Sequence, residues 1–310
     1  MKISFVIPVF RNEGSIVPTY NLLRELLDKL QADYDFVFVN DGSDDGSLTE
    51  LLQLHNNDRK VKVISFSRNF GQVAAVVAGL KEAAGDAVVV MSADLQEPVA
   101  LIEDMVSKWQ SGNDIVICHR IDREDGIIAN TTSRFFYSLM KYANPRMPKG
   151  GFDFVLIGRK PLEALNQLDE RNRFFQGDIL WLGFSTVFLP YSRLKRTVGK
   201  SQWTLAKKLK YFVDGLLNTS YIPIRLMSLL GMCFSVFGFL YALVIVYNRF
   251  INNTPFIGWA PIMITILIVG GLIMFMLGII GEYVWRTYDE TRKRPLYIIK
   301  DKFARNEESC

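Results

Sequence analysis

The sequence has few of the residues that bind soft metals or form disulfides. Among 310 residues there are two histidines, His55 and His119, and three cysteines, Cys118, Cys233 and Cys310. Because the cysteines are odd in number and widely spaced, they predict neither a disulfide framework nor a thiolate metal site. Two histidines are too few to build a histidine-rich metal site.

Charge is absent from two long stretches in the last third of the chain. No Asp, Glu, Lys or Arg lies between Arg225 and Arg249, or between Arg249 and Glu282. Both gaps exceed the ~20 residues that an α-helix needs to cross a bilayer. We therefore predict two transmembrane helices, at 226–247 and 259–283, joined by a short hairpin. The alternative is a pair of buried core helices, although soluble helices of this length usually have a polar face.

The positive charges around these two stretches predict an orientation. The hairpin contains only Arg249, whereas the flanks are rich in Lys and Arg: Lys207, Lys208, Lys210 and Arg225 before the first stretch, and Arg286, Arg292, Lys293 and Arg294 after the second. The positive-inside rule then predicts an integral inner-membrane protein with both termini in the cytoplasm. The net charge of +4 is modest, and its clustering near the membrane favours lipid headgroups over nucleic acid as partners.

The N-terminal half alternates apolar runs with helix-like segments. The first run, in "MKISFVIPVF", contains Pro8 and is too short for a signal peptide, so it predicts a strand. The apolar runs lie at 3–10, 36–41, 61–67, 87–94 and 114–120. This alternation predicts an α/β domain whose mostly parallel sheet is covered on both faces. Ligands of such sheets bind beyond the carboxyl ends of the strands.

The segment 201–225 mixes large apolar side chains with lysines just before the first predicted span. This pattern favours an amphipathic helix in the headgroup layer of the membrane. An ordinary surface helix of the soluble domain is the alternative.

Acidic turns follow three of the predicted strands. They are "PVFRNEG" with Glu13, "VNDGSDDGS" with Asp41, Asp44 and Asp45, and "SADLQEP" with Asp94 and Gln96. Taken singly, each is also what turns and helix N-caps prefer, and for Asp45 capping is the favoured interpretation. Together at one sheet edge they predict oxygen ligands for Mg²⁺ or Mn²⁺.

The order of these motifs resembles a known family. "VIPVFRNE", "VNDGSDDGS", "RNFGQ", "ADLQEP", "TSRFFY", "GKSQW" and "GEYVWRTYDETRKRPLYIIK" resemble the polyprenyl-phosphate glycosyltransferases of glycosyltransferase family 2, which include bactoprenol glucosyltransferases and dolichol-phosphate mannose synthases. The resemblance covers nearly the whole chain. It implies a Rossmann-like GT-A domain at 1–200, an interfacial region at 201–225, a transmembrane hairpin at 226–283 and a cytosolic basic tail at 284–310.

The resemblance also implies roles in binding a nucleotide-sugar donor. Pro8, Glu13 and Asp41 would hold the base and ribose. Asp94 and Gln96 would bind the metal and the diphosphate, with Asp94 part of the catalytic centre. A mobile basic loop would close over the diphosphate through Arg196, Lys200 and Ser201, although a plain basic loop near lipid has the same composition.

The acceptor would be a polyprenyl phosphate held by Arg120, Arg134 and Ser138. Arg134 and Ser138 are spaced i, i+4, so on a helix both could contact one phosphate; a solvated surface charge is the alternative for Arg134. Asp153 matches a catalytic aspartate of the family, in the sequence Gly-Phe-Asp-Phe. A phosphate monoester has a second pKa of ~6 and hardly needs a base. We therefore expect Asp153 to orient the sugar or acceptor and to stabilise positive charge at the anomeric carbon.

These roles predict transfer of one hexose from a UDP-sugar, UDP-glucose or a relative, to undecaprenyl phosphate with inversion. The chain lacks the Gln-x-x-Arg-Trp motif of processive polysaccharide synthases, which is one alternative. Another is an inactive nucleotide-sugar-binding partner of a flippase. Relatives form homo-oligomers, and we expect a tetramer. Many relatives have Asp where this chain has Ser92, which predicts weak metal binding in the absence of the donor.

Overall fold

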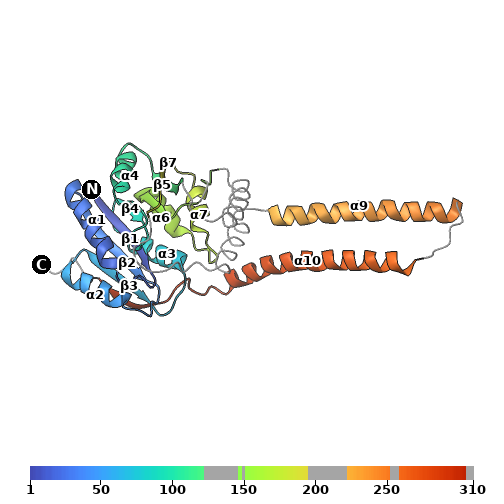
Figure 1. Cartoon of the computed structure of the whole chain (residues 1–310), viewed down its shortest axis with the longest axis horizontal. Coiled ribbons are helices and arrows are strands. Elements are labelled where there is room, and N and C mark those ends of the chain that lie inside the picture. The colour runs from blue at the N-terminus through green and yellow to red at the C-terminus, as the bar shows by residue number, and fades with distance from the viewer. Residues whose placement is uncertain (122–145, 149–150, 195–221, 252–257, 305–310) are drawn as a thin grey trace. The chain divides into compact units, whose positions relative to one another are not determined.

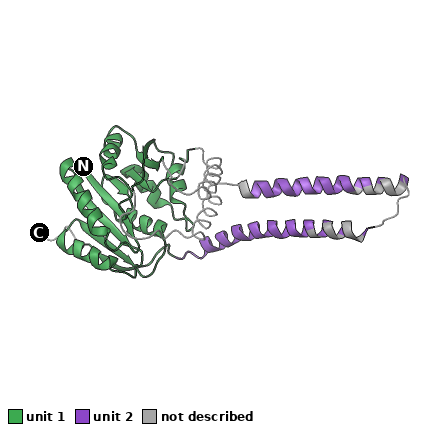
Figure 2. Ribbon diagram, viewed as in Figure 1, with its two compact units in different colours: residues 1–218, 295–310 green, residues 219–294 purple. Residues whose placement is uncertain are grey.

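The computed structural model describes residues 1–121, 146–148, 151–194, 222–251 and 258–304. The chain divides into two compact units, shown in green and purple in Figure 2. The first comprises Met1–Asn218 and Pro295–Cys310, and the second comprises Thr219–Arg294. The chain thus leaves the first unit for the second and returns to the first near its C-terminus.

The described part of the first unit is built on an eight-stranded sheet (Figure 1). Its strands lie in the order β7-β5-β6-β4-β1-β2-β3-β8. Their bounds are β1 (Lys2–Val9), β2 (Asp33–Asn40), β3 (Val61–Phe66), β4 (Ala87–Val90), β5 (Ile115–Arg120), β6 (Phe154–Gly158), β7 (Thr186–Tyr191) and β8 (Ile299–Phe303).

The direction of the strands decides which loops meet. β1 pairs in parallel with β2 and β4, and β2 with β3, as the alternating pattern predicts. β6 runs antiparallel to both β4 and β5, β7 is parallel to β5, and β8 is antiparallel to β3. The carboxyl ends of β1 to β5 and β7 therefore share one edge of the sheet with the amino ends of β6 and β8. We call this the site edge.

Helices cover both faces of the sheet. One face packs against α1 (Ile16–Leu30), α2 (Ser47–Asn57) and α4 (Leu101–Gln110). The other packs against α3 (Gln72–Glu82), α6 (Arg159–Gln167) and α7 (Phe175–Trp181). Successive side chains of a strand point to opposite faces, so Phe5 and Ile7 enter the first core and Val6 enters the second. All three are fully buried, which explains the continuous apolar runs in the sequence.

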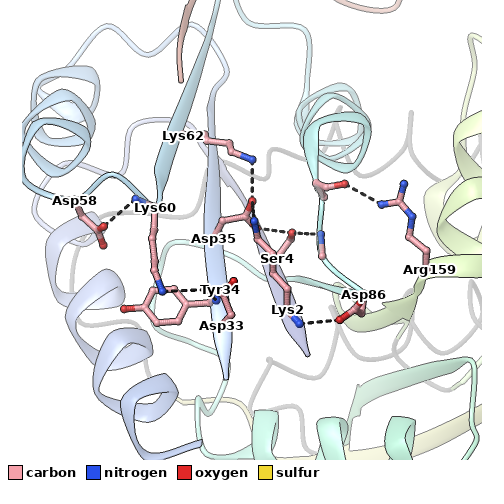
Figure 3. Close-up of polar contacts among 12 residues, drawn as sticks. Lys2, Ser4, Asp33, Tyr34, Asp35, Asp58, Lys60, Lys62, Asp86 and Arg159 are labelled. Atoms are coloured by element: carbon pink, nitrogen blue, oxygen red, sulfur yellow. Dashed lines mark hydrogen bonds and ion pairs between the residues drawn. The ribbon is translucent and has the colours of Figure 1, made fainter. Parts of the chain in front are cut away.

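A polar network joins the strands at the edge opposite the site edge (Figure 3). Asp35 in β2 is buried and accepts hydrogen bonds from Ser4 Oγ of β1 and from Lys62 Nζ of β3, the latter at 2.8 Å. Ser4 Oγ in turn accepts a hydrogen bond from Gly85 N at 2.8 Å, just before β4. The buried carboxylate is thus satisfied by its neighbours, and it has a structural role.

The segment after the second unit extends the sheet. β8 lies against β3, with Val63 opposite Phe303. Ahead of β8, the ring of Tyr297 stacks on Phe66 with 5.0 Å between centroids and an interplanar angle of 10°. Lys302 forms an ion pair with Glu82 of α3 at 2.7 Å. Part of the tail at 284–310 is therefore a strand of the first unit.

The second unit consists, in its described part, of the helices α9 (Ile222–Ile251) and α10 (Trp259–Thr291). Both are long and apolar enough to cross a membrane, and the candidate spans within them, Ile224–Tyr241 and Ile268–Thr291, are 6% and 0% buried, respectively. Large side chains such as Phe237 and Met274 are exposed. Core helices would bury these groups, so the structure contradicts that alternative and supports membrane association. Most of the predicted interfacial helix at 201–225 lies outside the described residues.

Candidate active site

Asp41, at the end of β2, holds the loop that follows β3. The residue is buried, and its carboxylate accepts hydrogen bonds from Asn69 Nδ2 at 2.9 Å, Phe70 N at 2.6 Å and Gly71 N at 2.9 Å. The two loops approach closely at Gly42, where an added Cβ would lie 2.4 Å from the carbonyl carbon of Arg68. Asp41 therefore shapes this part of the site edge, and its contact with a donor stays a prediction.

Glu13, in the loop after β1, contacts the start of α2. Its Oε2 accepts a hydrogen bond from Gly46 N at 2.9 Å, and its own N–H donates to Asp45 Oδ2 at 3.3 Å. Asp45 Oδ1 also accepts from Ser47 N at 3.1 Å, but Gly46, which has no side chain, is the N-cap residue of α2, so the capping interpretation of Asp45 is not confirmed. Pro8 lies within β1 opposite Val39 of β2. The residues predicted to hold the base and ribose thus lie on β1 or in the loops that follow the neighbouring strands β1 and β2.

The loop after β4 carries Asp94 and Gln96. The N–H of Gln96 donates to Asp94 Oδ1 at 3.2 Å, which closes a tight turn around Leu95. Leu95 has a φ of 58°, in the left-handed region that non-glycine residues rarely occupy. Asp94 is 6% exposed. Strained backbone of this kind clusters at ligand-binding loops, which agrees with the role predicted for this turn.

Glu97 is a buried carboxyl group in the same loop that the sequence analysis did not single out. Its Oε1 and Oε2 lie 2.5 and 2.7 Å from Ser92 Oγ, and its side chain is 1% exposed. Burial and then the charge of Asp94 raise the pKa of Glu97 to about 7. The hydroxyl of Ser92 can donate to this group, whereas an ionised Asp could not. Glu97 lies in the motif "ADLQEP". The unusual serine at position 92 is the sequence feature that could have pointed to it.

Arg120 and Asp153 form an ion pair at the same edge. Arg120 ends β5, Asp153 immediately precedes the antiparallel strand β6, and Arg120 Nη2 lies 3.1 Å from Asp153 Oδ2. Arg120 Nε also donates to Tyr191 Oη at 3.4 Å. Burial opposes the charge of Arg120, but Asp153 and Tyr191 outweigh it and raise its pKa. The carboxylate of Asp153 is 41% exposed and can meet a ligand.

Arg193, just after β7, is a second cation that the sequence analysis missed. Its Nη2 lies 3.7 Å from Asp94 Oδ2. The next residue, Leu194, donates its N–H to Gln96 O at 3.0 Å and accepts from Gln96 Nε2 at 3.3 Å. The basic contacts predicted from the sequence lie a few residues later in the chain. Arg196, Lys200 and Ser201, like Arg134 and Ser138, lie outside the described residues.

A pocket of about 340 Å³ lies beside Arg120. It is lined by His119, Arg120, Ile121, Arg146, Pro148 and Phe188. The Nδ1 atom of His119 is buried without a hydrogen-bond partner among the described residues, and burial lowers the pKa of this imidazole. Two guanidinium groups in one pocket favour an anionic ligand.

Asp94 and Gln96 supply part of the ligand set that a hard divalent cation needs. Asp94 and Gln96 offer oxygen ligands of the kind that Mg²⁺ and Mn²⁺ prefer. The guanidinium of Arg193 beside Asp94 shows that this place already carries a positive charge. Within the described ranges, no group of three or more His, Cys, Asp and Glu residues is arranged to hold a metal. The remaining ligands of a cation here would come from a bound molecule, from water or from residues outside the described ranges.

Comparison with known proteins decides the family. The family described as "Glycosyl transferase family 2" matches residues 4–165, which include Asp41, Asp94, Arg120 and Asp153. The chain belongs to glycosyltransferase family 2. Both the predicted family and the predicted GT-A fold are thereby confirmed.

Relatives of this glycosyltransferase match nearly its whole length. It is 37% identical to the uncharacterised glycosyltransferase YkcC of Bacillus subtilis, over 98% of this chain and 95% of that one. It is 36% identical to a prophage bactoprenol glucosyl transferase homologue of Escherichia coli and 35% identical to the bactoprenol glucosyl transferase of Shigella phage SfV, in each case over 97% of this chain and 99% of the relative. Matches of this extent must include most of α9 and α10.

Among solved structures, the glycosyltransferase resembles mannosyl-3-phosphoglycerate synthase from Rubrobacter xylanophilus. The two share 14% sequence identity with a TM-score of 0.51, over 69% of this chain and 71% of the other. At this identity the likeness concerns the fold alone.

Proposed function

We propose that this glycosyltransferase transfers a single hexose, glucose, from a nucleotide sugar to a polyprenyl phosphate at the cytoplasmic face of the membrane. The donor is UDP-glucose or a close relative, and the acceptor is undecaprenyl phosphate. The observation that carries the proposal is the site edge, where an oxygen-rich loop at Asp94 lies beside a cationic pocket at Arg120. The proposal is also supported by similarity to bactoprenol glucosyl transferases over nearly the whole chain.

The donor is bound at the loops after β1, β2 and β4. Glu13, Asp41 and Pro8 shape the part that takes the base and ribose, and Asp94 and Gln96 face the diphosphate. A divalent cation, Mg²⁺ or Mn²⁺, held by Asp94 and Gln96 would neutralise the charge of the departing diphosphate. In the basic loop, Arg196, Lys200 and Ser201 add positive charge and a hydroxyl to the same group.

The acceptor phosphate is bound in the pocket beside Arg120. The guanidinium of Arg120, together with Arg134 and Ser138, provides the hydrogen-bond donors that a phosphate dianion requires. An oxygen of this phosphate attacks the anomeric carbon as the bond to the nucleoside diphosphate breaks, so the configuration inverts. Asp153, ion-paired with Arg120 at 3.1 Å, orients the reacting groups and stabilises the positive charge that develops on the sugar.

The helices α9 and α10 anchor the enzyme where its lipid acceptor resides. Both termini lie in the cytoplasm, because the basic residues flank this hairpin and its connection contains little positive charge. The segment 201–225 lies in the headgroup layer, and the enzyme assembles as a homotetramer. Crosslinking in native membranes tests the tetramer, and protease protection of tags at each terminus tests the orientation.

The activity is tested with the purified full-length protein in nanodiscs, radiolabelled UDP-glucose and a short polyprenyl phosphate. The expected product is a lipid-linked monosaccharide whose formation stops on addition of a chelator. A lipid-linked polymer would favour a processive synthase, and donor binding without turnover would favour an inactive flippase partner. If no nucleotide sugar gives any lipid-linked product, the proposed function is wrong.

A further inference from the structure

The segment after β7 is attached to the loop that carries Asp94 and Gln96. Leu194 exchanges two hydrogen bonds with Gln96, at 3.0 and 3.3 Å, although the two residues lie 98 positions apart in the chain. These contacts fix the backbone next to Arg193. Its guanidinium is thereby held beside Asp94, with 3.7 Å between Nη2 and Oδ2.

The charges around Arg193 allow another cation to replace it in the ion pair with Asp94. Burial and then the nearby charge of Arg120 lower the pKa of Arg193, while Asp94 and Glu97 act in the opposite direction. Arg120 has its own partner in Asp153. The distance between Arg193 and Asp94 exceeds that of a direct hydrogen bond, so the pair is held by charge more than by geometry. A stronger cation at Asp94 can displace Arg193.

A divalent cation and the guanidinium of Arg193 cannot share Asp94 without strong repulsion between like charges. The donor, however, supplies two negatively charged phosphates together with its cation. We propose that Arg193 is a counter-ion of Asp94 in the donor-free enzyme, and that it moves to the donor diphosphate when the nucleotide sugar and its cation bind.

This proposal rests on the proposed function, and it assigns Arg193 a role in donor binding. It also gives a physical reason for weak metal binding in the absence of the donor. A lone cation must displace a positive group and offers it no anion in exchange. A cation that arrives with a diphosphate displaces the same group and provides the new partner.

The first test measures Mn²⁺ binding to the donor-free, full-length protein by titration calorimetry. We expect Arg193→Gln to bind Mn²⁺ about tenfold more tightly than the wild type, because a competing positive charge is gone. Such a gain cannot come from misfolding. Arg193→Lys, which keeps the charge, should behave like the wild type.

The matched control is Arg159→Gln, which removes the same charge elsewhere. Arg159 begins α6 at the sheet edge opposite the site edge (Figure 3). Its Nε lies 2.8 Å from Glu163 Oε1 on the same helix. We expect this variant to leave Mn²⁺ affinity unchanged. An equal gain in both variants would mean that only net charge matters, and it would refute the specific role of Arg193.

The second test measures binding of UDP, and of GDP, at saturating Mn²⁺. We expect Arg193→Gln to weaken nucleoside diphosphate binding about tenfold, the opposite direction to its effect on Mn²⁺ alone. If the variant binds both ligands as the wild type does, the inference about Arg193 fails while the proposed function stands. If the wild type binds neither nucleotide, the proposed function itself fails.

Discussion

Substitution of Glu97 by Gln should remove a pH dependence from the stability of the first unit. In the folded protein burial raises the pKa of Glu97 to about 7 from an ordinary 4.5. Between these pH values the folded state keeps a proton that the unfolded state has released. The free energy of unfolding therefore falls as the pH rises, and the stabilisation present below 4.5 is lost above about 7.

The size of this effect follows from the shift. A difference of about 2.5 pKa units at about 1.4 kcal/mol per unit corresponds to about 3 kcal/mol between pH 4.5 and pH 8. For a domain of this size that is roughly 6–12 °C in the midpoint of thermal unfolding. The Glu97→Gln variant carries no titratable group at this position, so it should lose this slope while keeping an acceptor for Ser92 Oγ.

The assay is thermal unfolding of the full-length protein in detergent with chelator present, at constant ionic strength from pH 5 to pH 8. The difference in midpoint between wild type and Glu97→Gln should change steadily with pH. Glu103→Gln, at an exposed position of α4, is the matched control and should run parallel to the wild type. Parallel curves for Glu97→Gln as well would refute the assignment of a buried, proton-binding carboxyl group.

Three further substitutions probe other parts of the first unit. Asp41→Asn should lower the unfolding free energy by about 2–3 kcal/mol, because its amide nitrogen would face backbone N–H groups; an unchanged thermal midpoint would contradict the hydrogen bonds described for Asp41. Asp153→Asn should reduce kcat at least about a hundredfold with little change in thermal midpoint, since this side chain is 41% exposed; full activity would rule out a role for its charge beside Arg120. Tyr297→Ala should cost about 2 kcal/mol through lost ring packing, and calorimetric unfolding would detect it; no change would mean that β8 contributes little to the first unit.

Much of the architecture follows from local sequence patterns. Strands such as β1 and β2 are buried on both faces, so their apolar runs mark them without knowledge of their neighbours. The two uncharged stretches identify α9 and α10, because few other structures go so long without charge. Asp94 and Gln96 could be proposed as site residues from the sequence, because they lie in one short turn directly after a strand, where a parallel sheet binds its ligands.

The partners of these residues depended on the tertiary structure. Arg120 meets Asp153 only because β6 runs antiparallel, which brings its amino end to the edge where β5 ends. Arg193 lies beside Asp94 because β7 ends at the site edge. No local sequence pattern distinguishes Arg193 from the neighbouring basic residues.

The sequence by itself thus determined the strands β1 to β5, the two long apolar helices and the acidic turn of this enzyme, because these depend on periodicity and composition within a few residues. Tertiary structure decided that Glu97 is buried behind Ser92, that Arg193 lies 3.7 Å from Asp94, and that the strand β8 of the tail completes the sheet. Each of these depends on contacts between segments that are distant in the sequence. Strand direction sets the distances between these residues and burial affects their charge, and neither follows from residue type.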